Sequence, residues 1–107
     1  MFNFFGTRTR ISINDAAEAA KKDTSIRLFD VRSLEEFREG HIPGSVSLPL
    51  DRLANAQALV LDKGEKIYVY CASGARSALA ANSLKRMGYS DVTNIGGIMS
   101  YSGPIAR

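Results

Sequence analysis

The only cysteine of the chain, Cys71, stands between a predicted strand and a predicted helix. Residues 66–70 ahead of it are rich in β-branched and aromatic side chains, which is typical of a buried strand. Residues 72–77 behind it are small and polar, and they lead into the helix-forming run 78–81. A thiol at such a junction faces backbone N–H groups and the positive end of a helix dipole, which both stabilise the thiolate. We therefore interpret Cys71 as a nucleophile and not as a packing residue.

The loop after Cys71 has the composition of an anion-binding cradle. Small residues allow successive backbone N–H groups to turn inward, and Gly74 tolerates the positive φ that such a loop needs. Arg76 could point its guanidinium at an anionic substrate, or it could pair with a carboxylate at the start of the helix. For Ser77, hydrogen bonds to backbone groups of the first helical turn are favoured over a substrate contact.

Size and composition indicate an ordinary globular protein. A length of 107 residues suggests one domain spanning 1–107, with 45% hydrophobic residues to form a core. The net charge of +3 comes without a run of basic residues, so we expect no nucleic-acid partner. One cysteine and one histidine exclude an intrachain disulfide and argue against a zinc site, so we expect no metal.

The single thiol fits a reducing compartment, and we expect a cytoplasmic protein with no membrane partner. No apolar run reaches the length of a membrane span, which is about 20 residues. Phe2, Phe4 and Phe5 are too few for the apolar part of a signal peptide. We expect them to cover part of the core or to form a dimer contact.

Predicted strands and helices alternate along the chain. This order, with apolar strands bounded by Gly, Pro and Asp, predicts an α/β fold in which helices cover both faces of a mostly parallel sheet of about five strands. Ligands of such folds bind beyond the carboxyl ends of the strands, where Cys71 and Asp30 lie. We expect strands at 9–11, 26–31, 46–48, 66–70 and 91–95, helices from Ser12 or Asn14 and at 34–39, 52–59 and 75–87, a tight turn at 96–97, and a short helix before Pro104.

Three segments of the chain resemble the single-domain rhodanese, or sulfurtransferase, family. They are Asp30-Val31-Arg32 with Glu36-Phe37 and the run Gly-His-Ile-Pro-Gly-Ser at 40–45, the run Cys-Ala-Ser-Gly-Ala-Arg-Ser at 71–77, and Gly96-Gly97. The resemblance extends over nearly the whole chain and implies the three-layer α/β/α fold of that family. It also implies a sulfurtransferase that carries a sulfane sulfur as a persulfide on Cys71.

The resemblance further implies a sulfur donor such as thiosulfate, an acceptor such as cyanide or a thiol, and no cofactor. A persulfide-carrying protein is a further candidate partner. His41 could titrate near neutral pH, but we expect it to stabilise a turn. The implied site comprises Cys71 as the catalytic residue, Ala72, Ser73, Gly74, Ala75 and Arg76 as substrate-binding residues, and Asp30, Arg32, Glu36, His41 and Ser77 as structural support.

Two alternatives to sulfur transfer are a non-catalytic rhodanese-like protein-binding module and a phosphatase or arsenate reductase. Phosphatases of related architecture place five residues between cysteine and arginine, whereas four separate Cys71 from Arg76. Residue 70 is tyrosine where that pattern has histidine, so both features favour sulfur transfer. Two departures from the rhodanese pattern are Tyr101 in place of a tryptophan and a loop without the Cys-Gly-Ser/Thr-Gly start of mercaptopyruvate-using relatives. We therefore expect thiosulfate or a protein persulfide as the donor.

Overall fold

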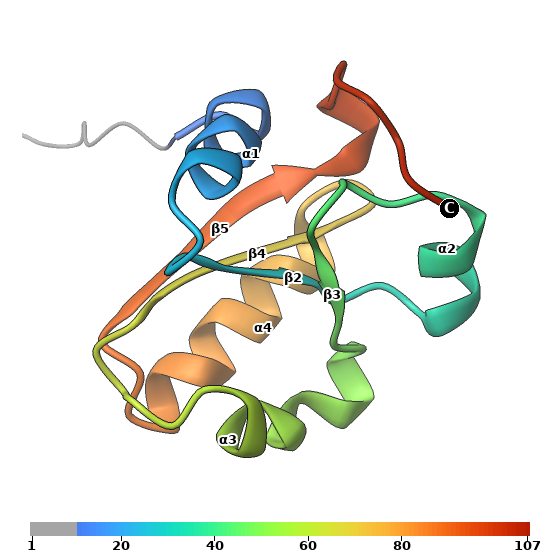
Figure 1. Ribbon diagram of the computed structural model, residues 1–107. Coiled ribbons are helices and arrows are strands. Elements are labelled where there is room, and N and C mark those ends of the chain that lie inside the picture. The colour runs from blue at the N-terminus through green and yellow to red at the C-terminus, as the bar shows by residue number, and fades with distance from the viewer. Residues whose placement is uncertain (1–10) are drawn as a thin grey trace, which may run out of the picture.

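The computed structural model describes residues 11–107. Its central sheet has four parallel strands in the order β3-β2-β4-β5 (Figure 1). This arrangement confirms the predicted α/β fold with a parallel sheet, but the described residues form four strands and not the five that the sequence predicts. The strands are β2 (Arg27–Asp30), β3 (Val46–Ser47), β4 (Lys66–Cys71) and β5 (Asp91–Gly97).

Helices cover both faces of the sheet. Figure 1 shows α1 on one face, and α3 and α4 on the other, with α2 beyond the end of β2. The three layers predicted from the alternation of elements are therefore present. The helices are α1 (Ile13–Lys22), α2 (Leu34–Glu39), α3 (Ala56–Leu59) and α4 (Ala75–Arg86), with 3₁₀ segments η1 (Leu50–Asn55) and η2 (Ile98–Ser100).

The side chains of β4 alternate between two apolar cores. Tyr68 and Tyr70 face α1, where Tyr101 also packs. Val69 and Cys71 belong to the cluster that α4 and η1 cover on the other face. Because successive side chains of a strand point to opposite faces, this register directs the thiol towards the helix that follows it.

Local capping explains why two of the helices begin where they do. Ser12 caps α1 by accepting a hydrogen bond from the N–H of Asp15, which decides between the two predicted caps. Ser33 and Glu36 form a capping box at the start of α2, in which each side chain accepts a hydrogen bond from the other residue's N–H. The capping box places the Glu36 carboxylate at the first turn of α2.

The predicted tight turn at Gly96-Gly97 is wrong. Both glycines belong to β5, where Gly96 pairs with Tyr70 and Gly97 pairs with Cys71. The positive φ of Gly96, 101°, accompanies a bulge in the ladder and not a reversal of the chain. Strand β5 therefore runs alongside β4 as far as the cysteine.

Other differences concern element boundaries. The predicted helix 52–59 is split into η1 and α3, because Arg52 leaves helical geometry with φ −119°. Of the predicted strand 9–11, Ile11 lies in no strand, while Thr9 and Arg10 fall outside the described residues. The expectation for Phe2, Phe4 and Phe5 also falls outside them. Within residues 11–107, none of the helices has the length and apolar character needed to span a bilayer.

Candidate active site

Cys71 ends β4, and its sulfur lies against the start of α4. The N–H of Gly74 donates to Cys71 Sγ at 3.0 Å, and the N–H of Ser77 donates at 3.3 Å. Gly74 is the N-cap of α4 but has no side chain to accept the free N–H groups of the first turn. The sulfur occupies the place of a capping oxygen, so the loop holds it at the positive end of the helix.

The same loop favours the ionised form of the thiol. The side chain of Cys71 is only 1% exposed, and burial by itself opposes ionisation. Hydrogen bonds from the Ser77 hydroxyl and from the backbone N–H groups of Ser77, Gly74 and Ser73 outweigh burial, so the pKa of the Cys71 thiol is lowered. Among the described residues, the groups that hydrogen-bond to this sulfur are all uncharged, so the loop stabilises the anion through neutral donors.

Strand β5 supports the loop from behind. A Cβ on Gly97 would collide with the carbonyl oxygen of Ala72 and with Cα of Ser73. The Ala72 carbonyl accepts a hydrogen bond from the N–H of Met99 at 3.1 Å. Glycine at position 97 therefore lets the loop cross directly over the end of β5.

Asn94 joins the loop to β5 through its side-chain amide. Its Nδ2 donates to the Gly74 carbonyl at 3.1 Å, and its Oδ1 accepts from the Gly96 N–H at 2.9 Å. The hydroxyl of Ser77 also donates to Asn94 Oδ1, at 2.6 Å. Ser77 is fully buried, and its Oγ lies 3.4 Å from Cys71 Sγ. Asn94 thus fixes Gly74 and Ser77, the two residues whose N–H groups donate to the sulfur at 3.0 and 3.3 Å.

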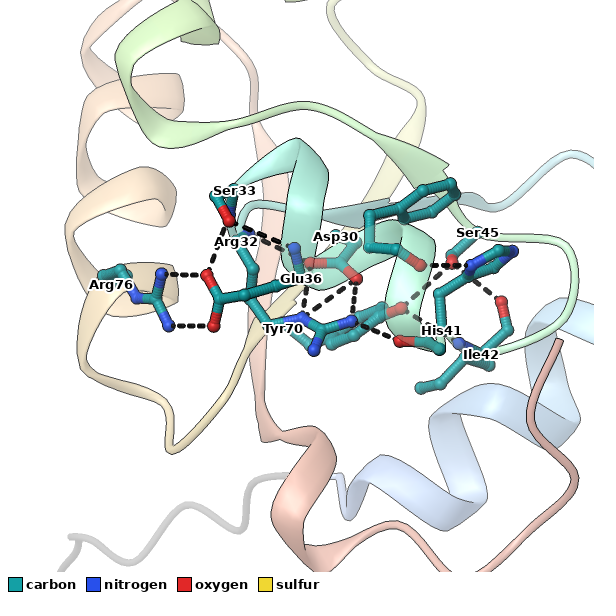
Figure 2. A network of polar contacts seen from close by, with 11 residues as sticks. Asp30, Arg32, Ser33, Glu36, His41, Ile42, Ser45, Tyr70 and Arg76 are labelled. Atoms are coloured by element: carbon teal, nitrogen blue, oxygen red, sulfur yellow. Dashed lines mark hydrogen bonds and ion pairs between the residues drawn. The ribbon is translucent and has the colours of Figure 1, made fainter. Parts of the chain in front are cut away.

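Arg76 makes a two-point ion pair with Glu36, as Figure 2 shows. Nη1 lies 2.7 Å from Oε1 and Nη2 lies 3.0 Å from Oε2. The hydrogen bond from Arg76 is the main cause that lowers the pKa of Glu36 to about 2; burial acts in the opposite direction. Of the two roles predicted for Arg76, the carboxylate partner is the one occupied in this structure.

A second ion pair is buried at the end of β2. Arg32 Nη2 donates to Asp30 Oδ2 at 2.6 Å and to the Gly40 carbonyl at 2.7 Å. The side chain of Asp30 is 0% exposed and that of Arg32 is 9% exposed. Arg32 also lies above the ring of Tyr70, 5.9 Å from its centroid. This pair connects the end of β2 to the chain that leaves α2.

The buried hydroxyl of Tyr70 extends the network to the turn before β3 (Figure 2). It accepts a hydrogen bond from the N–H of Ile42 at 3.1 Å and lies 2.9 Å from Ser45 Oγ. Burial is the main cause that raises the pKa of Tyr70, so the phenol stays protonated. Since Tyr70 precedes Cys71 in β4, the network ties the sheet to the loops around the thiol.

His41 contacts α2 and the C-terminal segment. Its ring stacks on Phe37 with a centroid distance of 3.7 Å, and Nδ1 donates to the Phe37 carbonyl at 2.8 Å. Its backbone exchanges two hydrogen bonds with Ala106. Among the described residues, no hydrogen bond of His41 reaches the loop of Cys71.

The structure therefore gathers most of the predicted site around two connected regions. Cys71, the loop and Ser77 form one region, which the Arg76–Glu36 pair joins to α2; the pair Asp30–Arg32, beside Tyr70, belongs to the other. The sequence analysis missed Asn94, Tyr70 and Ser45, because no local pattern marks a polar side chain that hydrogen-bonds across elements. Within residues 11–107, no cluster of three His, Cys, Asp or Glu side chains could hold a metal ion.

Comparisons with known proteins agree with this geometry. The family model described as "Rhodanese-like domain" matches residues 13–103. The "Thiosulfate sulfurtransferase PspE" of Escherichia coli is 37% identical over 79 residues, covering 70% of this chain and 73% of that protein. The "Putative sulfur carrier protein YrkF" of Bacillus subtilis is 36% identical over 85 residues, covering 79% of this chain and 45% of that protein.

A solved structure of a human single-domain sulfurtransferase, TSTD1, superposes with a TM-score of 0.69 at 27% identity. The match covers 84% of this chain and 90% of the human one. The chain therefore belongs to the rhodanese-like domain family, whose relatives include proteins named as sulfurtransferases. It spans less than half the length of the Bacillus protein.

Proposed function

We propose that this chain transfers a sulfane sulfur through a persulfide on Cys71. The Cys71 thiolate attacks the outer sulfur of the donor, an S–S bond forms to Cys71, and the donor's own S–S bond breaks. With thiosulfate, the leaving group is sulfite, which departs with the bonding electron pair. A thiolate or cyanide then attacks the outer sulfur of the persulfide and regenerates the Cys71 thiolate. This is a two-step exchange with a covalent intermediate.

The observation that carries the proposal is the pair of backbone N–H groups on Cys71 Sγ, from Gly74 at 3.0 Å and Ser77 at 3.3 Å. These donors favour the thiolate that must attack. The outer sulfur of a persulfide is also an anion, and we expect the backbone N–H groups of residues 72–76 to bind it. In this mechanism the attacking group is the thiolate, whose formation is favoured because the same donors lower the pKa of Cys71.

The spacing of the loop supports sulfur transfer over phosphate chemistry. Four residues separate Cys71 from Arg76, and Arg76 is engaged by a carboxylate. A tetrahedral phosphate ester needs a wider ring of donors and a free arginine. We therefore expect no hydrolysis of a chromogenic phosphate ester above the background of Cys71→Ser; hydrolysis that depends on Cys71 would favour the phosphatase alternative.

The direct test is the intact mass of the protein after incubation with thiosulfate or an organic persulfide and removal of the excess. The wild type is expected to gain the mass of one sulfur atom, and a reducing thiol should remove it. Cys71→Ser and Cys71→Ala should gain nothing. If the wild type gains no sulfur from either donor, the proposal is wrong, and a folded chain that still binds a protein partner would instead be a binding module.

A further inference from the structure

The charge of Arg76 is offset by Glu36. Both guanidinium ends contact the carboxylate, and the two side chains come from different elements, α4 and α2 (Figure 2). The pair is partly exposed, with 40% of the Arg76 side chain and 33% of the Glu36 side chain accessible. The pair therefore lies at the surface, next to the loop that begins at Cys71.

Glu36 is held in place independently of Arg76. Its Oε1 also accepts the N–H of Ser33 at 3.0 Å, as part of the capping box of α2. Since the pKa of Glu36 is lowered to about 2, the carboxylate stays ionised at every pH at which the protein would work. Arg76 therefore meets a fixed negative charge and not a mobile counter-ion.

The second cation near the site is also offset. Arg32 is paired with the buried carboxylate of Asp30 at 2.6 Å. Within residues 11–107, these four charged side chains form two pairs of opposite sign, and the hydrogen bonds to Cys71 Sγ come from uncharged groups. An arginine that is paired with a carboxylate stabilises a second negative charge on the donor less than an unpaired arginine would.

We propose that Glu36 is a specificity-determining residue that offsets Arg76 and so favours sulfur donors of low charge, such as organic persulfides and thiosulfonates, over the thiosulfate dianion. The inference rests on the proposed function and names the donor class for that site. A thiosulfonate, R–SO₂–S⁻, gives its outer sulfur to the Cys71 thiolate and leaves as the sulfinate R–SO₂⁻, which carries one charge. Thiosulfate leaves as sulfite, which carries two.

The test compares KM and kcat for thiosulfate and for methanethiosulfonate, with cyanide as the acceptor and thiocyanate as the readout. Glu36→Gln keeps an oxygen for the capping box and removes the charge. The Glu36→Gln substitution should lower the KM for thiosulfate about two- to fivefold, because an exposed charge pair typically contributes a free energy of that size. The KM for methanethiosulfonate should fall by a smaller factor. The kcat values should change little. Glu35→Gln is the matched control, because Glu35 is an exposed neighbour on α2 and should change neither KM.

A double variant separates charge from direct contact. Arg76→Gln leaves Glu36 without its partner and should raise the KM for thiosulfate more than that for methanethiosulfonate. Glu36→Gln with Arg76→Gln removes one charge of each sign, so the ratio of the two KM values should return close to that of the wild type. A double variant as poor with thiosulfate as Arg76→Gln alone would overturn the proposal, since Arg76 would then bind the donor directly.

The two proposals fail in different ways. If the wild type takes sulfur from both donors but Glu36→Gln leaves the ratio of the KM values unchanged, the role of Glu36 is wrong and the sulfurtransferase proposal stands. If the wild type takes sulfur from neither donor, both are wrong. Thermal unfolding of each variant shows whether it is folded, and we expect all of them to fold because the pair is partly exposed.

Discussion

Ser77 and Asn94 share a hydrogen bond of 2.6 Å, while the same Ser77 hydroxyl lies 3.4 Å from Cys71 Sγ. The hydroxyl has one proton, so the amide oxygen of Asn94 and the thiolate compete for it. Asn94 is fixed by the Gly96 N–H and the Gly74 carbonyl and cannot turn its nitrogen towards Ser77 without losing both bonds. The hydroxyl can therefore follow the protonation state of Cys71, donating to Asn94 beside the thiol and to Sγ beside the thiolate.

Ser77→Ala should therefore raise the pKa of Cys71, because the thiolate loses one of its donors. The pH dependence of alkylation by iodoacetamide measures this pKa. At pH 7 the rate should fall about two- to tenfold, as expected for the loss of one hydrogen bond. Ser83→Ala, on the same helix and away from the thiol, is the control. An unchanged pH midpoint in Ser77→Ala would mean that the hydroxyl stays on Asn94 in both states.

The ion pair of Glu36 should stabilise the fold in a pH-dependent way. The pKa of Glu36 is about 2 in the folded protein, against an ordinary value of 4.5. A lowered carboxylate pKa contributes stability that is complete above the ordinary value and is lost as pH falls through the folded value. The difference in the free energy of unfolding between wild type and Glu36→Gln should therefore be constant near pH 6 and shrink between pH 4.5 and 2. Urea unfolding at several pH values measures it, and a difference that does not change with pH would contradict the ion pair.

Breaking the buried pair Asp30–Arg32 should lower the free energy of unfolding more than breaking an exposed pair. Arg32→Met leaves the fully buried Asp30 carboxylate without its partner, which should cost about 3–5 kcal/mol of unfolding free energy. Arg27→Met is the control, since Arg27 pairs with Glu65 at 2.7 Å where both are partly exposed, and it should cost less than about 1 kcal/mol. Equal costs in urea unfolding would show that Asp30 does not depend on Arg32.

Gly97→Ala should disturb the loop through the new Cβ. The methyl group would collide with the Ala72 carbonyl, so the loop must shift and its N–H groups move away from Cys71. We expect a lower stability and a large loss of sulfur uptake. Gly44→Ala is the control, because Gly44 has a φ of 86° but open space around it. It should cost about 1–2 kcal/mol and leave sulfur uptake intact. Normal sulfur uptake by Gly97→Ala would contradict the contact.

Local signals explain what the sequence could predict of this fold. The bounds of α2 follow from Ser33 and Glu36 at its start and Gly40 at its end, all within a few residues of one another. The β-branched and aromatic residues before Cys71 predict a strand there. The left-handed conformation of Gly74 is predicted because an anion-binding loop needs a residue with positive φ. Cys71 could be singled out because its position between strand and helix is itself a local pattern.

The remaining features depend on contacts between distant residues. Gly96-Gly97 continues β5 because β4 lies beside it and the loop crosses over it, and neither neighbour is near it in sequence. Glu36, the partner of Arg76, is 40 residues away in the sequence. From the sequence alone, Arg76 could therefore contact either a substrate or a carboxylate. No residue next to Asn94 in the sequence marks it as part of the site. Its amide reaches Gly74 and Ser77 only in the folded chain.

The most direct test of the central claim is a single turnover on the sulfur-loaded protein. The loaded wild type, freed of donor, is treated with cyanide while thiocyanate and the intact mass are followed together. The proposed persulfide predicts one thiocyanate per loaded chain and a return to the unloaded mass, with no thiocyanate from Cys71→Ser. A loaded mass that cyanide leaves unchanged, or thiocyanate formation that persists in Cys71→Ser, would contradict sulfur transfer through Cys71.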